Sequence, residues 1–489
     1  MTAQAWWDEE WDVVVAGGGG AGLMAAYAAA ERGAEVLLVE KMPGLGGATE
    51  MAVGTISAAG TQLQQAAGVQ DDVETHFRDY LEFRTPGTSP EDYDLELTRL
   101  LVERSPATLQ RLIDMGISYT GPHPEPPHTV KRMHNALPDA GVYIETLERQ
   151  ALDAGVTIRT ETTIQEMERD EDGNVSRLVT RHVRRHEFKA IRARRGVVLA
   201  TGYFGANKEL ARAYGRPAEI SEIEPSLESA TGDGIVLATA LGAATAGMGD
   251  GDKPAFRTAM PPYVRPEPNL FTEGAVLVNA DGRRFTNELE APELATSRQS
   301  RGIAFMVFDA SLAARIATVA DDSPGTRDGW LRNGKLFLST FPGIAYAYLD
   351  DFRERTDYFY EADSLAGLAD QLRVPVGALE EDMGVTAEAA VGTRPDPFGK
   401  LPTGQGVSVP PFYAIGPLRP NIGSSGGLKI DREMRVIDVD GVAIPHLYAA
   451  GITGASNALI AGHGHALSWA FTSGHLAGEN AASEAPVHE

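Results

Sequence analysis

The stretch Trp11-Asp-Val-Val-Val-Ala-Gly-Gly-Gly-Gly-Ala-Gly-Leu-Met-Ala-Ala-Tyr-Ala-Ala-Ala-Glu-Arg-Gly-Ala-Glu-Val-Leu-Leu-Val-Glu40 decides the fold. It reads as an apolar strand, a glycine turn, an alanine-rich helix, a second strand and a final carboxylate. Gly17, Gly19 and Gly22 form G-x-G-x-x-G, in which the backbone can approach a pyrophosphate and the helix can pack close to the strand. The N–H groups at the start of the helix favour an anion. Glu40 can accept hydrogen bonds from a ribose hydroxyl. We therefore predict a bound dinucleotide, against the alternative of a purely structural turn.

Composition excludes several classes of function. The chain has 489 residues and a net charge of −25, so a nucleic-acid partner is not expected. It has no cysteine, which excludes disulfides, cysteine-bound iron–sulfur clusters and a thiol nucleophile in this chain. His123, His128 and His134 lack an acidic cluster or cysteines around them, so no metal site is expected.

The sequence also suggests a location. Residues 1–11 are acidic and lack the basic and apolar regions of a secretion signal. No apolar run reaches the roughly 20 residues that a membrane span needs. We expect a cytoplasmic protein without a membrane span.

The remaining sequence predicts an α/β fold with a discontinuous first domain. Strands that end in small residues recur at 195–202 and 447–451, whereas proline-rich loops and mixed elements begin near Met248. We expect residues 1–248 and 409–489 to form a Rossmann-like domain, interrupted by an α+β domain at 249–408. Local patterns predict amphipathic helices within 72–115, a helix at 143–154 and a hairpin turn at 170–174.

Several further blocks carry a family resemblance. They are Glu40-Lys41, Gly46-Gly-Ala-Thr49, Leu199-Ala-Thr-Gly202, Thr231-Gly-Asp-Gly234, Asp281-Gly-Arg-Arg-Phe-Thr-Asn-Glu288 and Leu447-Tyr-Ala-Ala-Gly451. Together with the opening motif they resemble the FAD-dependent fumarate reductase/succinate dehydrogenase flavoprotein superfamily. Within it, the pattern is closest to the 3-ketosteroid dehydrogenases of the delta-1 or delta-4 type.

This resemblance implies that the first domain binds FAD and that 249–408 is a substrate-binding cap. The helix expected to start around Leu467 would point its N-terminus at the flavin. Covalent members have a histidine where this chain has Gly46-Gly-Ala-Thr49, so we expect non-covalent FAD. The implied cofactor-binding residues are Gly17, Gly19, Gly20, Ala21, Gly22, Glu40, Lys41, Gly47, Ala48, Thr49, Thr163, Thr201, Gly202, Gly451, Asn457, Leu467 and Ser468.

Dicarboxylate chemistry is not expected, because the resemblance fails at three positions. Pro292 stands about where the family's proton-donating arginine belongs, and Asn421-Ile-Gly-Ser-Ser-Gly-Gly427 lacks the family's histidine. Ala455-Ser-Asn-Ala-Leu459 lacks the arginine that clamps a carboxylate.

The ketosteroid pattern also holds only in part. Gly462 matches the glycine whose N–H contacts the ketone, but the tyrosine expected shortly before it is missing. His463 and His465 could replace that tyrosine as acid or base, or could simply bond to backbone in a glycine-rich turn. The further candidates from the cap and from an earlier loop are Tyr346, Tyr348 and Tyr119, each of which could equally serve packing.

We expect an FAD-dependent oxidoreductase that desaturates a cyclic or steroid-like ketone at its α,β-carbons, with hydride passing to flavin N5. The same site run backwards gives the alternative, an ene-reductase of activated C=C bonds. A flavoprotein subunit of an electron-transfer complex is a second alternative. No second nucleotide motif is visible, so the expected partners are a small cyclic ketone or enone and an external electron carrier: a quinone, oxygen or a carrier protein.

Overall fold

The chain folds into two compact units. The structure is a computed structural model, which describes residues 7–84, 88–125, 127–220, 223–249, 254–258, 265–266, 268–317, 339–341, 344–347, 349–355 and 357–487. Unit 1 comprises Met1–Arg216, Ser226–Asp252 and Gly423–Glu489, and unit 2 comprises Pro217–Pro225 and Lys253–Ile422. Unit 2 includes most of the segment 249–408 that we expected to be an inserted domain. Its use as a substrate cap stays a prediction.

The central sheet of unit 1 has, among the described residues, eight strands. They run β21-β22-β9-β1-β2-β6, and β7 and β8 join through β9. Their bounds are β1 (Glu9–Ala16), β2 (Val36–Val39), β6 (Thr157–Arg159), β7 (Thr162–Arg169), β8 (Val175–His182), β9 (Phe188–Leu199), β21 (Arg435–Ile437) and β22 (Ala443–Ala449). Parallel pairs join β1 to β2 and β9, and β9 to β22, whereas β7, β8 and β9 pair antiparallel. The predicted α/β fold is confirmed, with mixed sheets.

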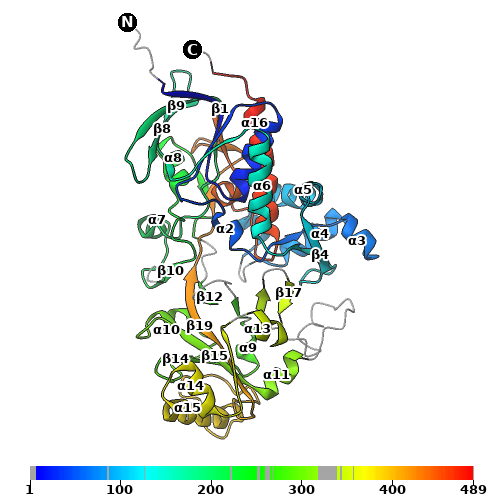
Figure 1. Cartoon of the computed structure of the whole chain (residues 1–489), viewed down its shortest axis with the longest axis vertical. Coiled ribbons are helices and arrows are strands. Elements are labelled where there is room, and N and C mark those ends of the chain that lie inside the picture. Colours follow the sequence, from blue (N-terminus) through cyan, green and yellow to red (C-terminus); the bar gives the residue numbers. More distant parts are fainter. Residues whose placement is uncertain are drawn as a thin grey trace. The chain divides into compact units, whose positions relative to one another are not determined.

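Helices and small sheets surround this central sheet. The helices are α1 (Gly20–Glu31), α2 (Gly47–Glu50), α3 (Gln62–Ala66), α4 (Val73–Leu81), α5 (Leu95–Asp114), α6 (Gly141–Asp153), α7 (Lys208–Ala213), α8 (Asp233–Ala240) and α16 (His465–Ser483). The small sheets contain β3 (Thr55–Ser57), β4 (Ser118–His123), β5 (Met133–Leu137), β11 (Thr245–Ala246) and β20 (Gly427–Leu428). Figure 1 shows that the first and last parts of the chain, blue β1 and red α16, lie side by side.

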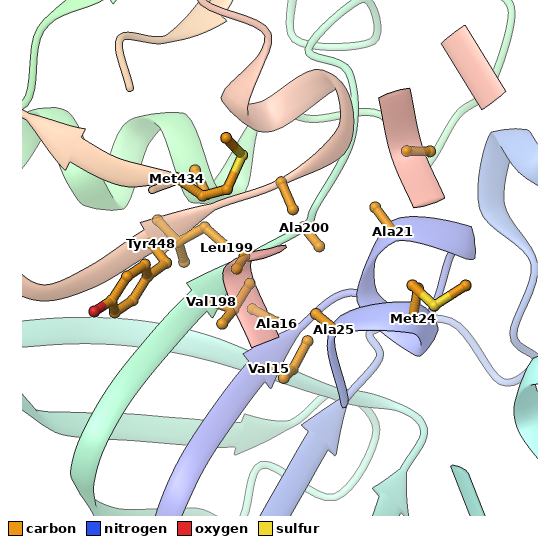
Figure 2. Packing of buried hydrophobic residues seen from close by; sticks show 14 of the residues in the cluster. Val15, Ala16, Ala21, Met24, Ala25, Val198, Leu199, Ala200, Met434 and Tyr448 are labelled. Atoms are coloured by element: carbon orange, nitrogen blue, oxygen red, sulfur yellow. The ribbon is translucent and has the colours of Figure 1, made fainter. Parts of the chain in front are cut away.

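Glycines bring α1 and α16 into close contact. A Cβ atom built at Gly474 would lie 2.3 Å from the Ala21 carbonyl oxygen, and one at Gly478 would lie 2.1 Å from that of Ala25. The small residues of α1 and α16 therefore let the backbones of the two helices approach each other closely. Figure 2 shows that α1 also packs closely on the central sheet, where Ala25 lies close to Val15 of β1. Both residues are fully buried.

Most local predictions for unit 1 agree with the structure. The expected helices in 72–115 are α4 and α5, the expected helix at 143–154 is α6, and the turn at 170–174 joins β7 to β8. The last helix differs, because it begins at His465 rather than near Leu467. Gly464 has φ +84°, and a Cβ atom there would lie 2.4 Å from the Ser57 backbone nitrogen. This tight left-handed turn starts the helix early and makes His465 its first residue.

Unit 2 is built on β19 (Phe412–Ile422), which pairs with several strands of one sheet. The other strands of that sheet are β10 (Glu224–Pro225), β12 (Pro254–Thr258), β14 (Val276–Asn279), β15 (Ala304–Asp309) and β18 (Phe359–Ala362), and a separate small sheet contains β13 (Arg265–Pro266), β16 (Ser339–Phe341) and β17 (Ile344–Ala347). The helices are α9 (Asn269–Thr272), α10 (Pro292–Ser297), α11 (Ala310–Ala317), α13 (Leu349–Arg355), α14 (Leu365–Leu372) and α15 (Val376–Ala390).

A buried ion network explains part of the Asp281–Glu288 block. Glu288 accepts from Arg284 Nε at 3.0 Å and from Lys400 Nζ at 3.0 Å. Arg284 also contacts Asp396 at 2.7 Å, and all four side chains are nearly inaccessible to water. Because unpaired buried charges are costly, this block organises the interior of unit 2.

Among the described residues, no helix combines the length and the apolar character that a membrane crossing requires.

Candidate active site

A cleft opens in unit 1 where the parallel strands end at their carboxyl sides. Its lining includes Gly17 and Gly19 after β1, Glu40 after β2, Gly202 after β9 and Gly451 after β22. This is the edge at which open α/β sheets bind ligands. The cleft therefore lies where the glycine motif predicts a dinucleotide.

The glycines of the motif have two different tasks. A Cβ atom at Gly17 would lie 2.3 Å from the Ala200 carbonyl oxygen, and one at Gly22 only 1.8 Å from that of Gly17. These glycines permit close packing of strand and helix. At Gly19 the nearest atom would be 3.6 Å away, and at Gly202 no atom lies within 4 Å. Both of the latter line the cleft, so they leave room for a ligand against the backbone.

Two charged side chains close the far end of the cleft after β2. Glu40 accepts hydrogen bonds from the backbone N–H groups of Gly18 at 2.7 Å and Met42 at 2.8 Å. Lys41 extends to the start of α8, where its Nζ lies 2.8 Å from Asp233 Oδ2. These contacts hold Glu40 in place while its remaining lone pairs can accept from a ribose. A fixed carboxylate at this position fits the ribose of the adenosine half of FAD.

Part of the Gly46–Thr49 loop also lines the cleft, through Gly47, Ala48 and Thr49. It becomes the short helix α2, and Thr49 Oγ1 accepts a hydrogen bond from the Gly20 N–H at 3.1 Å. Ala466 and Leu467, in the first turn of α16, also line the cleft. The α16 N-terminus therefore faces the same space, which suits the anionic edge of a reduced flavin.

The structure brings fourteen of the seventeen proposed cofactor residues together around this cleft. They are Gly17, Gly19, Gly20, Ala21, Glu40, Lys41, Gly47, Ala48, Thr49, Thr163, Thr201, Gly202, Gly451 and Leu467. The lining does not include Gly22, Asn457 and Ser468. Asn457 Nδ2 donates to the Asp92 carbonyl oxygen, and Ser468 is fully buried with its Oγ 3.4 Å from the Ser57 carbonyl oxygen. These two residues shape the surrounding backbone.

His463 pairs with a carboxylate that sequence reasoning missed. Its Nδ1 lies 2.5 Å from Glu125 Oε1, and its backbone N–H donates to the same oxygen at 2.7 Å. The His463 side chain is 43% exposed, whereas that of Glu125 is 7% exposed. Glu125 comes from the proline-rich loop between β4 and β5. No spacing rule connects positions so far apart, and a carboxylate between prolines was the only available signal.

His465 has a different environment, although it is only two residues away. It is 1% exposed and stacks on Tyr80, with ring centroids 3.7 Å apart. Burial lowers the pKa of His465 to about 3. A histidine that stays neutral throughout the physiological range is a poor proton donor. Of the two histidines, only His463 is accessible from outside the fold, and neither of them is part of the cleft lining.

The other candidate residues are dispersed. Tyr119 lies on β4 beside Tyr143, with ring centroids 6.3 Å apart, and burial raises the pKa of its hydroxyl. It does not line the cleft. Gly462 has φ +115°, and a Cβ atom there would lie 3.1 Å from Phe83 Cδ1. Tyr346 lies on β17 of unit 2, and Tyr348 lies outside the described residues.

Comparisons with known proteins agree with the assignment of an FAD-binding domain to this chain. The family model described as FAD binding domain matches residues 12–461. The chain is 28% identical to the probable fumarate reductase Ifc3 of Shewanella frigidimarina, over 98% of this chain and 79% of that protein. Further matching proteins are named as an NADH:acrylate oxidoreductase, of which the chain spans half, a vinyl phenol reductase and a urocanate reductase.

The chain also resembles solved structures, among them the following two. The open conformation of a flavocytochrome c3 fumarate reductase gives a TM-score of 0.77 at 26% identity, covering 98% of this chain and 79% of that one. The 3-ketosteroid-Δ4-(5α)-dehydrogenase of Rhodococcus jostii RHA1 gives 0.62 at 25% identity, covering 98% of both chains.

Proposed function

We propose, from the premise that the chain belongs to the FAD binding domain family, that it reduces an activated C=C bond of an uncharged substrate. At the level of enzyme class, the chain is an FAD-dependent oxidoreductase of the fumarate reductase family. The reductive direction follows the reductases to which the chain is similar. The substrate class is an alkene conjugated to a ketone or a similar electron-withdrawing group.

The His463–Glu125 pair is the observation that carries this proposal. Reduction of an activated alkene adds a hydride, which a reduced flavin supplies when bound, and a proton, which the protein must supply. Ala466, in the first turn of α16, lines the cleft, and His463 lies three residues before Ala466 in the chain. With Nδ1 against Glu125, the Nε2 atom is the ring position that can hold and transfer the proton. Glu125 acts as a positioning residue by fixing the ring and its tautomer.

The cation content of the C-terminal segment favours an uncharged substrate. No lysine or arginine follows Arg435 in the sequence, so α16 and the turn before it contribute no cationic side chain of their own. Pro292 begins α10, where the resemblance would place a proton-donating arginine. A dicarboxylate needs cations that hold both of its ends. A cyclic enone needs only polarisation of its carbonyl by one donor.

Desaturation of a cyclic ketone, the reaction expected from the sequence, is the second candidate. It is supported by the likeness to the R. jostii dehydrogenase and by the position of Gly462. In that direction His463 Nε2 would remove the α-proton rather than deliver it. One arrangement of groups serves both directions, and the electron partner selects between them.

The attachment of FAD and the source of electrons complete the proposal. The loop Met42–Met51 contains no histidine, cysteine or tyrosine, so FAD is held without a covalent bond. Electrons come from a separate carrier, either a protein or a quinone.

The test is the direction of the half-reactions under anaerobic conditions. The FAD-loaded protein, reduced chemically, is mixed with cyclic enones, with fumarate or with saturated cyclic ketones, and the flavin absorbance is followed. The proposal expects fast reoxidation by at least one enone and slow reoxidation by fumarate. Rapid bleaching of the oxidised protein by a saturated ketone, without reoxidation by enones, would establish the desaturase instead. Fumarate as the fastest oxidant would contradict the substrate class.

A further inference from the structure

Three histidines from distant parts of unit 1 meet in its interior. His76 lies on α4, His128 lies in the loop between β4 and β5, and His465 begins α16. Their relative exposures are 0%, 5% and 1%. One ligand atom from each of them lies within 4.8 Å of the others. We refer to these three residues as the histidine cluster, and neither the reductase nor the desaturase proposal uses it.

The spacing of the ring nitrogens suits a common ligand. His76 Nε2 and His465 Nε2 lie 3.1 Å apart. Two nitrogens bound to one tetrahedral zinc ion at about 2.0–2.1 Å would lie about 3.3 Å from each other. The His128 ring is 5.5 Å from His76 and 5.4 Å from His465 between centroids, and it meets both edge-on. Only small adjustments would therefore place three nitrogens around one ion.

Hydrogen bonding within the protein leaves this cluster incomplete. A single N–H···N bond accounts for the His76–His465 contact, but both ring nitrogens of His128 lack a partner among the described residues. His76 Nδ1 also lacks one there. A buried polar group without a partner costs about 1–3 kcal/mol. A ligand that accepts the His128 lone pair would remove part of this cost.

The positive group nearest to the cluster is paired within the protein. Arg132 is buried and contacts Asp71 and Asp79 at 2.9 Å each. Its charge is therefore balanced by its own carboxylates and does not exclude a cation from the cluster.

Aromatic rings hold two of the histidines in place. Tyr80 stacks on His465, and its hydroxyl is fixed because it donates to the Ile460 carbonyl oxygen at 2.9 Å. Phe83 packs edge-on against His128, with ring centroids 4.7 Å apart. The rings are thereby restrained before any ligand binds, which is the usual arrangement of a preorganised metal site.

We propose that the histidine cluster binds one divalent transition-metal ion of the zinc type through three imidazole nitrogens, with its fourth position left to water. Imidazole ligands suit such ions. The ion would tie α4 and the Glu125-bearing loop to the first residue of α16, and so would stabilise the part of unit 1 that carries His463.

The test measures metal binding directly and does not depend on catalysis. The FAD-loaded full chain is stripped with a chelator, dialysed and titrated with Zn²⁺ in a calorimeter, and with Co²⁺ as a spectroscopic probe of coordination geometry. We expect one ion per chain, a tetrahedral Co²⁺ spectrum and a raised unfolding temperature. His128→Gln should weaken binding about tenfold or more, because it removes one of three ligands. The matched control is His134→Gln, since His134 is equally buried in unit 1 but lies outside the cluster.

Three outcomes would overturn the proposal. One is the absence of specific Zn²⁺ and Co²⁺ binding in the folded wild-type chain. Another is equal binding by wild type and His128→Gln, with circular dichroism confirming that the variant is folded. The third is weaker binding by the His134→Gln control than by His128→Gln. If His128→Gln does not fold, His76→Gln provides the same comparison. A cluster that holds only ordered water predicts the first outcome.

Discussion

Nδ1 of His463 lies 2.5 Å from Oε1 of Glu125, which links the turn before α16 to the loop between β4 and β5. The same carboxylate oxygen also accepts the His463 backbone N–H at 2.7 Å. Glu125 therefore fixes both the ring and the backbone of the proposed proton donor. A carboxylate on Nδ1 is the arrangement that orients the catalytic imidazole in the Ser-His-Asp triad.

Replacing Glu125 by glutamine should slow turnover while leaving the cofactor bound. The amide can keep one contact but loses the charge that holds the ring, so kcat should fall about tenfold or more with KM nearly unchanged. Steady-state kinetics over a range of pH, together with the flavin spectrum, checks this expectation. Glu171→Gln, at an exposed hairpin carboxylate, is the matched control. A rise in KM with an unaltered kcat would instead assign Glu125 to substrate binding.

Two glycines of the opening motif should respond oppositely to alanine. At Gly19, whose φ is −83°, a Cβ atom would enter open space in the cleft, so Gly19→Ala should keep its stability and bind FAD at least about tenfold more weakly. At Gly22 the Cβ atom would lie 1.8 Å from a carbonyl oxygen, so Gly22→Ala should lower the unfolding temperature. Thermal unfolding without FAD and FAD titration of the stripped proteins separate the two effects. Equal loss of stability in both variants would contradict this division of tasks.

The buried His134 should make stability depend on pH. Burial lowers its pKa to about 4, against about 6.5 for an exposed histidine. Between these values the unfolded chain binds the proton more readily, so the free energy of unfolding falls as the pH drops from about 6.5 to about 4, by about 1.4 kcal/mol per pH unit for this residue. Above about pH 6.5 its contribution is complete.

His134→Gln should therefore show a shallower decline across the same pH window. Urea unfolding at several pH values measures the slopes, and the difference between wild type and variant isolates His134. Identical slopes would mean that the pKa of His134 is the same in the folded and unfolded chain, which would contradict the expected shift.

Most of the residues that the sequence proposed for the cofactor lie around one cleft, because the signals that identify them are local. The strand, glycine turn and helix of residues 11–40 are neighbours in the chain, and Gly17 and Gly22 meet a packing requirement while Gly19 leaves open space. The start of α16 was less accurate, because Gly464 adopts its left-handed turn against β3, some 400 residues earlier. That contact leaves no local pattern.

The substrate side was hard to predict for the same reason. His463 and His465 looked equivalent in the sequence, yet one is half exposed beside Glu125 and the other is buried on Tyr80. His128 was grouped with His123 and His134 by spacing, whereas the fold places it with His76 and His465. Only tertiary contacts decide such groupings. The roles of Tyr346 and Tyr348 stay predictions.

The most direct test of the account is single-turnover reoxidation of the reduced flavoprotein by a cyclic enone, compared between wild type and His463→Asn. His186→Asn, at an exposed hairpin histidine, serves as the control. We predict rapid reoxidation by the wild type and the control, and a rate about 100-fold or more lower in His463→Asn with FAD still bound, because a general acid contributes about that much. Equal rates in wild type and His463→Asn would contradict the account.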